Sequence, residues 1–188
     1  TGCNSSATVK GVIFAGGIAG ETNYGATLTA CYATGDVTVE NDGTNNSHAG
    51  GVVGYNGGGT LTACYATGSV TGSGSGTIYV GGVTGHNSGT LTACYHANGT
   101  ISCPAGTTGG VTGRNYKSFN DPVITACYWG SNGQTQGIGD NQAGTGETTQ
   151  VDGTVTWNMA MTSMNQALQE AGSEWQYEPG DSLPTLNK

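Results

Sequence analysis

The sequence predicts an all-β protein: a parallel β-solenoid (β-helix) of about four coils of roughly 30 residues, followed by a C-terminal cap that contains one helix. Three observations predict it. The chain has 188 residues, of which 36 are Gly and only 35% are hydrophobic; two short motifs recur four times in the same order; and helical spacing occurs only near the C-terminus. Units with so few apolar residues cannot bury them alone, but stacked coils bury equivalent positions against one another.

The two motifs recur at a fixed phase. The first is Gly-Gly-x-x-Gly, at residues 16–20, 50–54, 81–85 and 109–113. The second is Leu or Ile followed by Thr-Ala-Cys-Tyr, at residues 28–32, 61–65, 91–95 and 124–128, and its cysteines lie 33, 30 and 33 residues apart. We expect about three short strands per repeat, with Gly at tight corners and Thr on half-exposed faces. A propeller is the main alternative, but its blades need about four strands and roughly 40 residues.

The register of the repeat predicts which side chains stack. We expect one inward column of Leu28, Leu61, Leu91 and Ile124. Asn56, Asn87 and Asn115 share the slot two residues after the first motif, where amides can form a ladder.

The chain divides into three predicted parts: the repeat solenoid over 1–130, a polar loop region over 131–153, and a cap over 154–188. In the cap, apolar residues from Trp157 to Ala171 fall at spacings of 4, 3, 4 and 3, which is one face of a helix. Thr156 suits the N-cap and Gly172 the residue after the last turn. We expect this helix to cover an open end of the solenoid.

The motifs resemble those of a known family. Gly-Gly-[Ile/Val]-x-Gly followed by Cys-Tyr-Ala-Thr-Gly, at 31–35 and 64–68, is similar to the GLUG-motif repeats of secreted and surface-anchored bacterial proteins. These include large adhesins and the non-catalytic repeats of immunoglobulin-A-specific metalloproteases. The resemblance implies an extracellular or cell-surface location and a structural or adhesive role. The third and fourth copies depart from it at 96–99 and 129–130.

Charge and composition exclude several functions. The net charge is −8 with only four Lys and Arg, which excludes a nucleic-acid partner, and no apolar run approaches the ~20 residues of a membrane span. Asp and Glu scatter through loops without sharing a repeat slot, so we predict that the protein is not an enzyme. We predict no cofactor; the oxygen-rich loops 41–46 and 140–147 are the nearest approach to a calcium site, and neither fits an EF-hand or nonapeptide pattern.

The six cysteines lack a Cys-x-x-Cys pair, which disfavours zinc. In stacked coils Cys31, Cys64, Cys94 and Cys127 form one column at a spacing of about 4.8 Å, which is within disulfide range. Disulfides and a ladder of buried thiols therefore both stay open. Cys3 and Cys103 are expected outside this column, about three coils apart, and hence either free or bonded to another subunit.

Two functions follow. The first is a non-catalytic extracellular module whose corner loops (21–26, 41–47 and 116–122) contact other surface proteins or glycans. The second is an ice or glycan binder that uses two outward columns: Thr27, Thr60 and Thr90, and Thr29, Thr62 and Thr92. Because Thr1-Gly2 matches Thr34-Gly35, we also expect the chain to enter mid-coil and to associate with its own copies end to end into a fibre.

Overall fold

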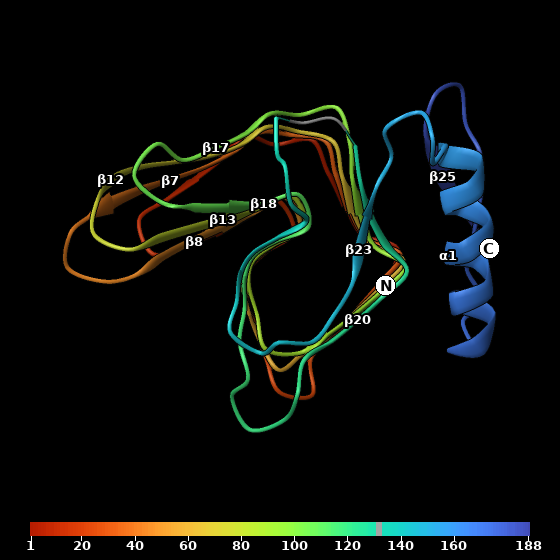
Figure 1. Ribbon diagram of the computed structural model, residues 1–188, viewed down its shortest axis with the longest axis horizontal. Helices are drawn as coiled ribbons and strands as arrows, with labels where there is room; N and C mark the ends of the chain where they lie inside the picture. The colour runs from red at the N-terminus through yellow and green to blue at the C-terminus, as the bar shows by residue number, and fades with distance from the viewer. Residues whose placement is uncertain (131–132) are drawn as a thin grey trace.

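The computed structural model describes residues 1–130 and 133–188, and it confirms the parallel β-solenoid. Viewed along the stack, the coils superimpose and the C-terminal helix lies beside them (Figure 1). Each full coil passes through five short strands, where the motifs predicted about three. The additional strands lie in polar, Gly-rich stretches such as Val70–Ser75, whose side chains carry little strand signal but whose backbones pair with neighbouring coils.

Two sheets border the most regular corner of the coil. The tyrosine sheet contains β1 (Asn4–Ser5), β6 (Tyr32–Ala33), β11 (Tyr65–Ala66), β16 (Tyr95–His96), β21 (Cys127–Trp129) and β23 (Thr148–Gln150). The threonine sheet contains β5 (Thr27–Thr29), β10 (Thr60–Thr62), β15 (Thr90–Thr92) and β20 (Val123–Thr125). All neighbouring strands in both sheets are parallel.

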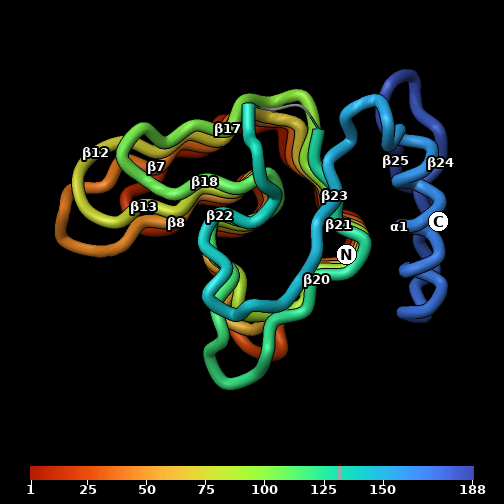
Figure 2. The backbone as a smooth tube through the Cα atoms, in the orientation of Figure 1, coloured from red at the N-terminus to blue at the C-terminus, as the bar shows by residue number. Residues whose placement is uncertain are grey.

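The other three sheets complete the coil. Two of them form an arm that projects from the solenoid (Figure 2). One arm sheet contains β2 (Val9–Gly11), β7 (Val37–Asp42), β12 (Val70–Ser75) and β17 (Ile101–Ser102). The second contains β3 (Phe14–Gly16), β8 (Ser47–Gly50), β13 (Ile78–Gly81) and β18 (Thr107–Gly109). The asparagine sheet contains β4 (Ala19–Asn23), β9 (Val53–Gly57), β14 (Thr84–Asn87), β19 (Thr112–Asn115) and β22 (Ile138–Asn141).

The segment for which we predict a polar loop region also extends the solenoid. Residues 131 and 132, at its start, lie outside the described residues. Further along, β22 adds to the asparagine sheet and β23 to the tyrosine sheet, so that a partial fifth coil covers the fourth. These strands escape a pattern search because their side chains are mostly polar.

The Gly-Gly-x-x-Gly motif marks the corner between the second arm sheet and the asparagine sheet. Backbones and side chains of neighbouring coils approach this corner too closely for a side chain. A Cβ on Gly82 would lie 2.5 Å from the Cβ of His96 and would meet the carbonyl oxygen of Gly110. A Cβ on Gly85 would lie 2.6 Å from the backbone nitrogen of Ala49. The motif recurs because every coil makes the same turn.

Apolar columns fill the interior as predicted. Leu61 pairs in register with Leu28 on one side and with Leu91 on the other, and Ile124 continues the column. Cys31, Cys64, Cys94 and Cys127 pack in the same cluster, together with the valines that follow Gly-Gly. Each column is therefore buried against its own copies in neighbouring coils.

The predicted amide ladder is present and is longer than the sequence indicated. Asn56 Nδ2 donates to Asn87 Oδ1 at 2.9 Å, and Asn87 Nδ2 donates to Asn115 Oδ1 at 3.1 Å. Thr22 donates to Asn56 at one end, and Asn115 donates to Asn141 at the other. The ladder thus spans all five coils and satisfies amides that would otherwise be costly to bury.

The C-terminal segment contains the predicted helix and a hairpin. Helix α1 (Trp157–Glu170) begins after Thr156, whose hydroxyl accepts a hydrogen bond from the backbone N–H of Met159, and it ends before Gly172, at φ +68°. Antiparallel strands β24 (Gln176–Pro179) and β25 (Pro184–Asn187) follow. No helix in the described residues is long and apolar enough to cross a membrane.

The helix covers the side of the solenoid and not its end, so the predicted position of the cap is wrong. Met164 and Leu168 pack against the stacked rings of Tyr65 and Tyr95, whose centroids lie 4.7 Å apart. The hydroxyl of Tyr177 donates to the backbone oxygen of Ala93 at 2.8 Å. The physical reason is the tyrosine column itself, because it projects outward from the coils and needs an apolar cover.

Candidate functional site: the corner hollow

The site begins with a difference in connection length. Between the asparagine and threonine sheets, the first coil uses residues 24–26, the second 58–59, the third 88–89 and the fourth 116–122. Two short connections therefore lie between two longer ones along the stack. Since the strands on either side are in register, the extra residues of the outer coils must project and leave a depression over the inner coils.

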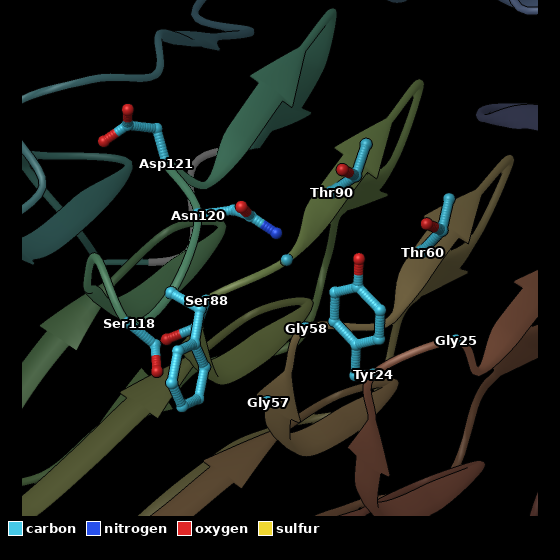
Figure 3. A pocket seen from close by; sticks show the side chains of 12 residues that line it. Tyr24, Gly25, Gly57, Gly58, Thr60, Ser88, Thr90, Ser118, Asn120 and Asp121 are labelled. Atoms are coloured by element: carbon cyan, nitrogen blue, oxygen red, sulfur yellow. The ribbon is translucent and has the colours of Figure 1, made fainter.

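The structure shows this depression, which we call the corner hollow. It has a volume of about 330 Å³. It is lined by Tyr24, Gly25, Gly57, Gly58, Thr60, Ser88, Gly89, Thr90, Ser118, Phe119, Asn120 and Asp121. In Figure 3, Tyr24 rises on one side and Ser118, Asn120 and Asp121 lie on the opposite side, with Ser88 and Gly58 between them. Two of the predicted corner loops, 21–26 and 116–122, thus meet at one site.

Two exposed aromatic residues of the longer connections line the hollow. Tyr24 is 78% exposed and Phe119 is 95% exposed. Sequence analysis placed both in corner loops but did not single either out. The signal that finds them is the length of each connection, which can be read only once the register of the asparagine and threonine sheets is known.

Hydroxyl groups of the threonine sheet and of a short turn line the inner part of the hollow. Thr60 and Thr90 are paired in register on β10 and β15. Ser88 is fixed in place because its Oγ lies 2.8 Å from Nε2 of His86 and donates to the backbone oxygen of Tyr116 at 2.8 Å.

The long connection is held by its own contacts. Lys117 Nζ lies 2.8 Å from a carboxylate oxygen of Asp121. The Arg114 guanidinium lies over the ring of Tyr116, with 4.3 Å between its Cζ and the ring centroid. Thr145 donates a hydrogen bond to the backbone oxygen of Pro122. These contacts hold both ends of the connection, on either side of the residues that line the hollow.

The predicted threonine columns are aligned as expected. Thr27, Thr60 and Thr90 pair in one column, which Val123 continues, and Thr29, Thr62, Thr92 and Thr125 form the other. Only part of each column faces a hollow. Thr60 and Thr90 line the corner hollow, whereas Thr29 and Thr62 border a second depression beside Trp175 and Lys188 of the C-terminal segment. Projecting residues thus flank the threonine face at both ends of its strands.

All six cysteines are free, so of the two alternatives for the column the structure shows the ladder of buried thiols. Cys64 Sγ lies 3.4 Å from the backbone oxygen of Thr62 and 3.5 Å from that of Leu28, so that its single S–H can donate to either oxygen. Burial raises the pKa of the Cys94 thiol well above its usual value. These thiols fill core space and satisfy their weak donors on carbonyl groups.

The expected position of Cys3 is wrong. Asn4 pairs with Tyr32, so Cys3 occupies the same slot as Cys31, at the start of the thiol column. Gly2, at φ +67°, matches the left-handed Ala30, at φ +54°. Thr1 therefore corresponds to Thr29 and not to Thr34. The spacing of 28 residues from Cys3 to Cys31 differs from the later repeats because the arm of the first coil is shorter: β2 and β3 have three residues each, and only residues 12–13 connect them.

Cys103 lies outside the thiol column, as expected, but inside the core of the arm. It is only 8% exposed and packs with Ile78 and Val80. Burial also raises the pKa of its thiol. A bond from Cys103 to another subunit would therefore require the arm to open, whereas Cys3 is exposed.

A second group of polar residues lies on the concave side of the Gly-Gly corner. The rings of Tyr55 and His86 stack at 4.4 Å, those of His48 and Tyr79 stack at 5.4 Å, and Arg114 lies over Tyr79 at 5.2 Å. Burial lowers the pKa of His48 to about 4 and that of His86 to about 3, with the charge of Arg114 adding to both effects. Both imidazoles are therefore neutral at pH 7 and serve as packing groups.

The two oxygen-rich loops are occupied by internal contacts. The Asn41 amide bonds to the backbone of Gly43, Asn45 and Thr77, and Asp140 pairs with Arg114 at 3.5 Å. Within the described residues, no three side chains of His, Cys, Asp or Glu lie close enough to hold a metal ion.

Comparison with known families identifies one turn of this architecture. Residues 45–71 match the model of the GLUG motif. No curated protein and no solved structure matches the chain. The matched residues run from the loop before β8 through β9, β10 and β11 to the start of β12. The predicted resemblance is thus confirmed, and the chain carries the GLUG motif, which here folds as nearly one complete coil of a parallel β-solenoid.

Proposed function

We propose that this chain is a non-catalytic extracellular repeat module with a structural or adhesive role at the cell surface. The observation that carries the proposal is the contrast between a stack held by in-register columns and corner loops that vary from coil to coil. Such a stack holds its corner loops at fixed spacings, which suits contact with other surface proteins or glycans. The GLUG motif, typical of extracellular proteins, supports the location.

The arrangement of charge supports a non-catalytic role. Each of the four basic side chains is engaged by a carboxylate: Lys10 with Glu40, Arg114 with Asp140, Lys117 with Asp121, and Lys188 with Glu174. Histidines 48, 86 and 96 are buried, and burial lowers the pKa of each to about 4 or below. The imidazoles, which most often act as general acids and bases, are therefore buried away from solvent and from any substrate.

Location and adhesion can be tested together. We expect an antibody to the purified chain to label intact cells of the organism that encodes it, and external protease to remove the label. Beads coated with the chain should attach to such cells more than beads coated with the acid-unfolded chain. Label that requires permeabilised cells, or attachment that does not depend on the fold, would contradict the proposal.

Self-association into a fibre is a further part of the proposal. Within the described residues, the strands of the first coil, β1 to β5, each lie at the edge of their sheet. Unpaired strand edges are templates for another chain. Light scattering should show a mass that rises with concentration, with Cys3 as the one accessible thiol that oxidation can cross-link. A monomer at all concentrations, in oxidising and reducing buffers, would exclude the fibre.

A further inference from the structure

We propose that the corner hollow binds a neutral oligosaccharide. This inference rests on the extracellular role proposed above and adds the ligand class and the site. Of the two threonine columns that the sequence suggested as a binding face, it uses only Thr60 and Thr90, and it adds the aromatic residues of the two longer connections.

The dimensions of the hollow suit a chain of several sugars. Tyr24 belongs to the connection of the first coil and Phe119 to that of the fourth, so three coil spacings of about 4.8 Å, or roughly 14 Å, separate the strands that flank them. The volume of about 330 Å³ is at the lower end of the usual range for ligand sites. The hollow is therefore a short trough with a wall at each end.

The walls offer what a pyranose ring needs. One face of a sugar ring presents C–H groups, and an aromatic side chain binds such a face through its flat apolar surface. Tyr24 and Phe119 expose their rings to solvent, at 78% and 95%. Exposed aromatic side chains that gather around a hollow are a common mark of a binding site.

The interior offers polar partners without net charge. The hydroxyls of Thr60 and Thr90 and the amide of Asn120 each donate and accept hydrogen bonds, as sugar hydroxyls do. Lys117 and Asp121 neutralise each other at 2.8 Å. A neutral polyhydroxyl ligand fits this lining better than a phosphate or a uronic acid, since both of those require an uncompensated positive charge.

The same features disfavour a peptide and an ice surface. A peptide that adds as a strand needs an open sheet edge, but β10 pairs with both β5 and β15, and β15 pairs with both β10 and β20. An ice surface needs a flat face, and Tyr24 and Phe119 stand at the two ends of this one. An oligosaccharide is narrow enough to lie between them.

The test is isothermal titration of the purified full chain with three neutral hexasaccharides, made of β-1,4-linked glucose, β-1,4-linked N-acetylglucosamine and α-1,6-linked mannose. We expect at least one to bind with a Kd between about 10 μM and 1 mM. Tyr24→Ala and Phe119→Ala should each weaken binding about 5- to 10-fold. Tyr24→Phe, which keeps the ring, should change the Kd less than twofold.

Two variants serve as matched controls. Met159→Ala removes an exposed apolar side chain on α1, and Thr125→Ala removes a hydroxyl of the second threonine column outside the hollow. Neither should change the Kd, and circular dichroism should show that all variants remain folded.

Three outcomes overturn the inference: no binding of any hexasaccharide up to about 10 mM, binding that persists in the Tyr24→Ala/Phe119→Ala double variant, or binding lost in Thr125→Ala.

The bead assay distinguishes failure of this inference from failure of the proposed function. If beads coated with the double variant attach as well as those coated with the native chain, adhesion stands and the hollow is not its site. If beads coated with either chain do not attach but the native chain binds a hexasaccharide, the hollow is a binding site and the proposed adhesive role is wrong.

Discussion

The chain turns a corner at each end of the strands of the threonine sheet, and the two corners are built in opposite ways. The first is the Thr-Ala-Cys-Tyr corner, which repeats in every coil and is buried beneath the C-terminal segment. The second is the corner between the asparagine and threonine sheets, whose connections have two to seven residues and face solvent. Repetition thus marks the corner that stabilises the stack, and departure from repetition marks the corner that can bind.

The buried corner shows how packing maintains an unfavourable backbone. Ala30, Ala63, Ala93 and Ala126 have φ between +48° and +54°, a region that non-glycine residues rarely adopt. Ala63 and Ala93 are completely buried in the cluster that contains α1. The methyl group that makes this conformation costly also fills the contact with the C-terminal segment, and so Ala stands where Gly would be less strained.

Acid should destabilise the whole stack and have the largest effect. Histidines 48, 86 and 96 have folded-state pKa values of about 4, 3 and 4, lowered mainly by burial, against about 6.5 when unfolded. Because the unfolded chain binds protons more tightly, stability is complete above about pH 6.5 and falls as the pH drops towards 4, by roughly 3 kcal/mol for each histidine. Urea denaturation at pH 7, 6, 5 and 4 measures this loss.

The variant His48→Phe measures the share of one histidine in the acid effect. His48 stacks among aromatic rings, and its Nδ1 has no hydrogen-bond partner, so a phenyl ring can occupy the same place. We expect the variant to retain more stability than the native chain at pH 4. Equal loss in both chains would show that His48 does not contribute to the acid transition.

Disruption of the buried corner should have the next largest effect. Leu168 is completely buried between α1 and the tyrosine column, so Leu168→Asp places an unpaired carboxylate there. We expect a loss of at least about 3 kcal/mol and increased aggregation, measured by thermal unfolding and light scattering. The exposed neighbour variant, Gln169→Asp, is the control and should lie within about 0.5 kcal/mol of the native chain.

The amide ladder links the variable corner to the regular stack, and its disruption should have an intermediate effect. Asn87 bonds with Asn56, Asn115 and the backbone of Gly89. Asn87→Ala leaves buried partners unsatisfied, and we expect a loss of about 2 kcal/mol in the free energy of unfolding. Asn141→Ala, at the end of the ladder, removes one acceptor and should cost less than about 1 kcal/mol. Similar losses in both variants would mean that the ladder does not act as a unit.

An insertion at the variable corner should have the smallest effect. Gly-Ser-Gly placed after Phe119 lengthens a connection that already projects into solvent, and loop-closure entropy predicts a cost of about 0.5 kcal/mol. The same insertion after Ala93 should prevent folding, because Ala93 is buried and its neighbours are in register. Comparison of the two melting temperatures tests whether only one of the corners tolerates variation.

The periodic sequence by itself determined the solenoid, its inward column, the amide ladder and the helix. The stacked features depend on similar residues at the same position of each repeat, as in the column Leu28, Leu61, Leu91 and Ile124 and in the column Asn56, Asn87 and Asn115. The helix follows separately from the spacing of apolar residues between Trp157 and Ala171. The strands in polar stretches were missed because backbone pairing gives no side-chain signal. Cys3 was placed in the wrong slot because the first coil is shorter than the others.

Only the tertiary structure decided where the C-terminal segment lies and where a ligand can bind. The tyrosine column and the helix are both apolar, but no periodicity states that one covers the other. Tyr24 and Phe119 lie 95 residues apart in the sequence, and neither belongs to a repeated motif. They line one hollow because the register of the stack sets four connections of unequal length side by side.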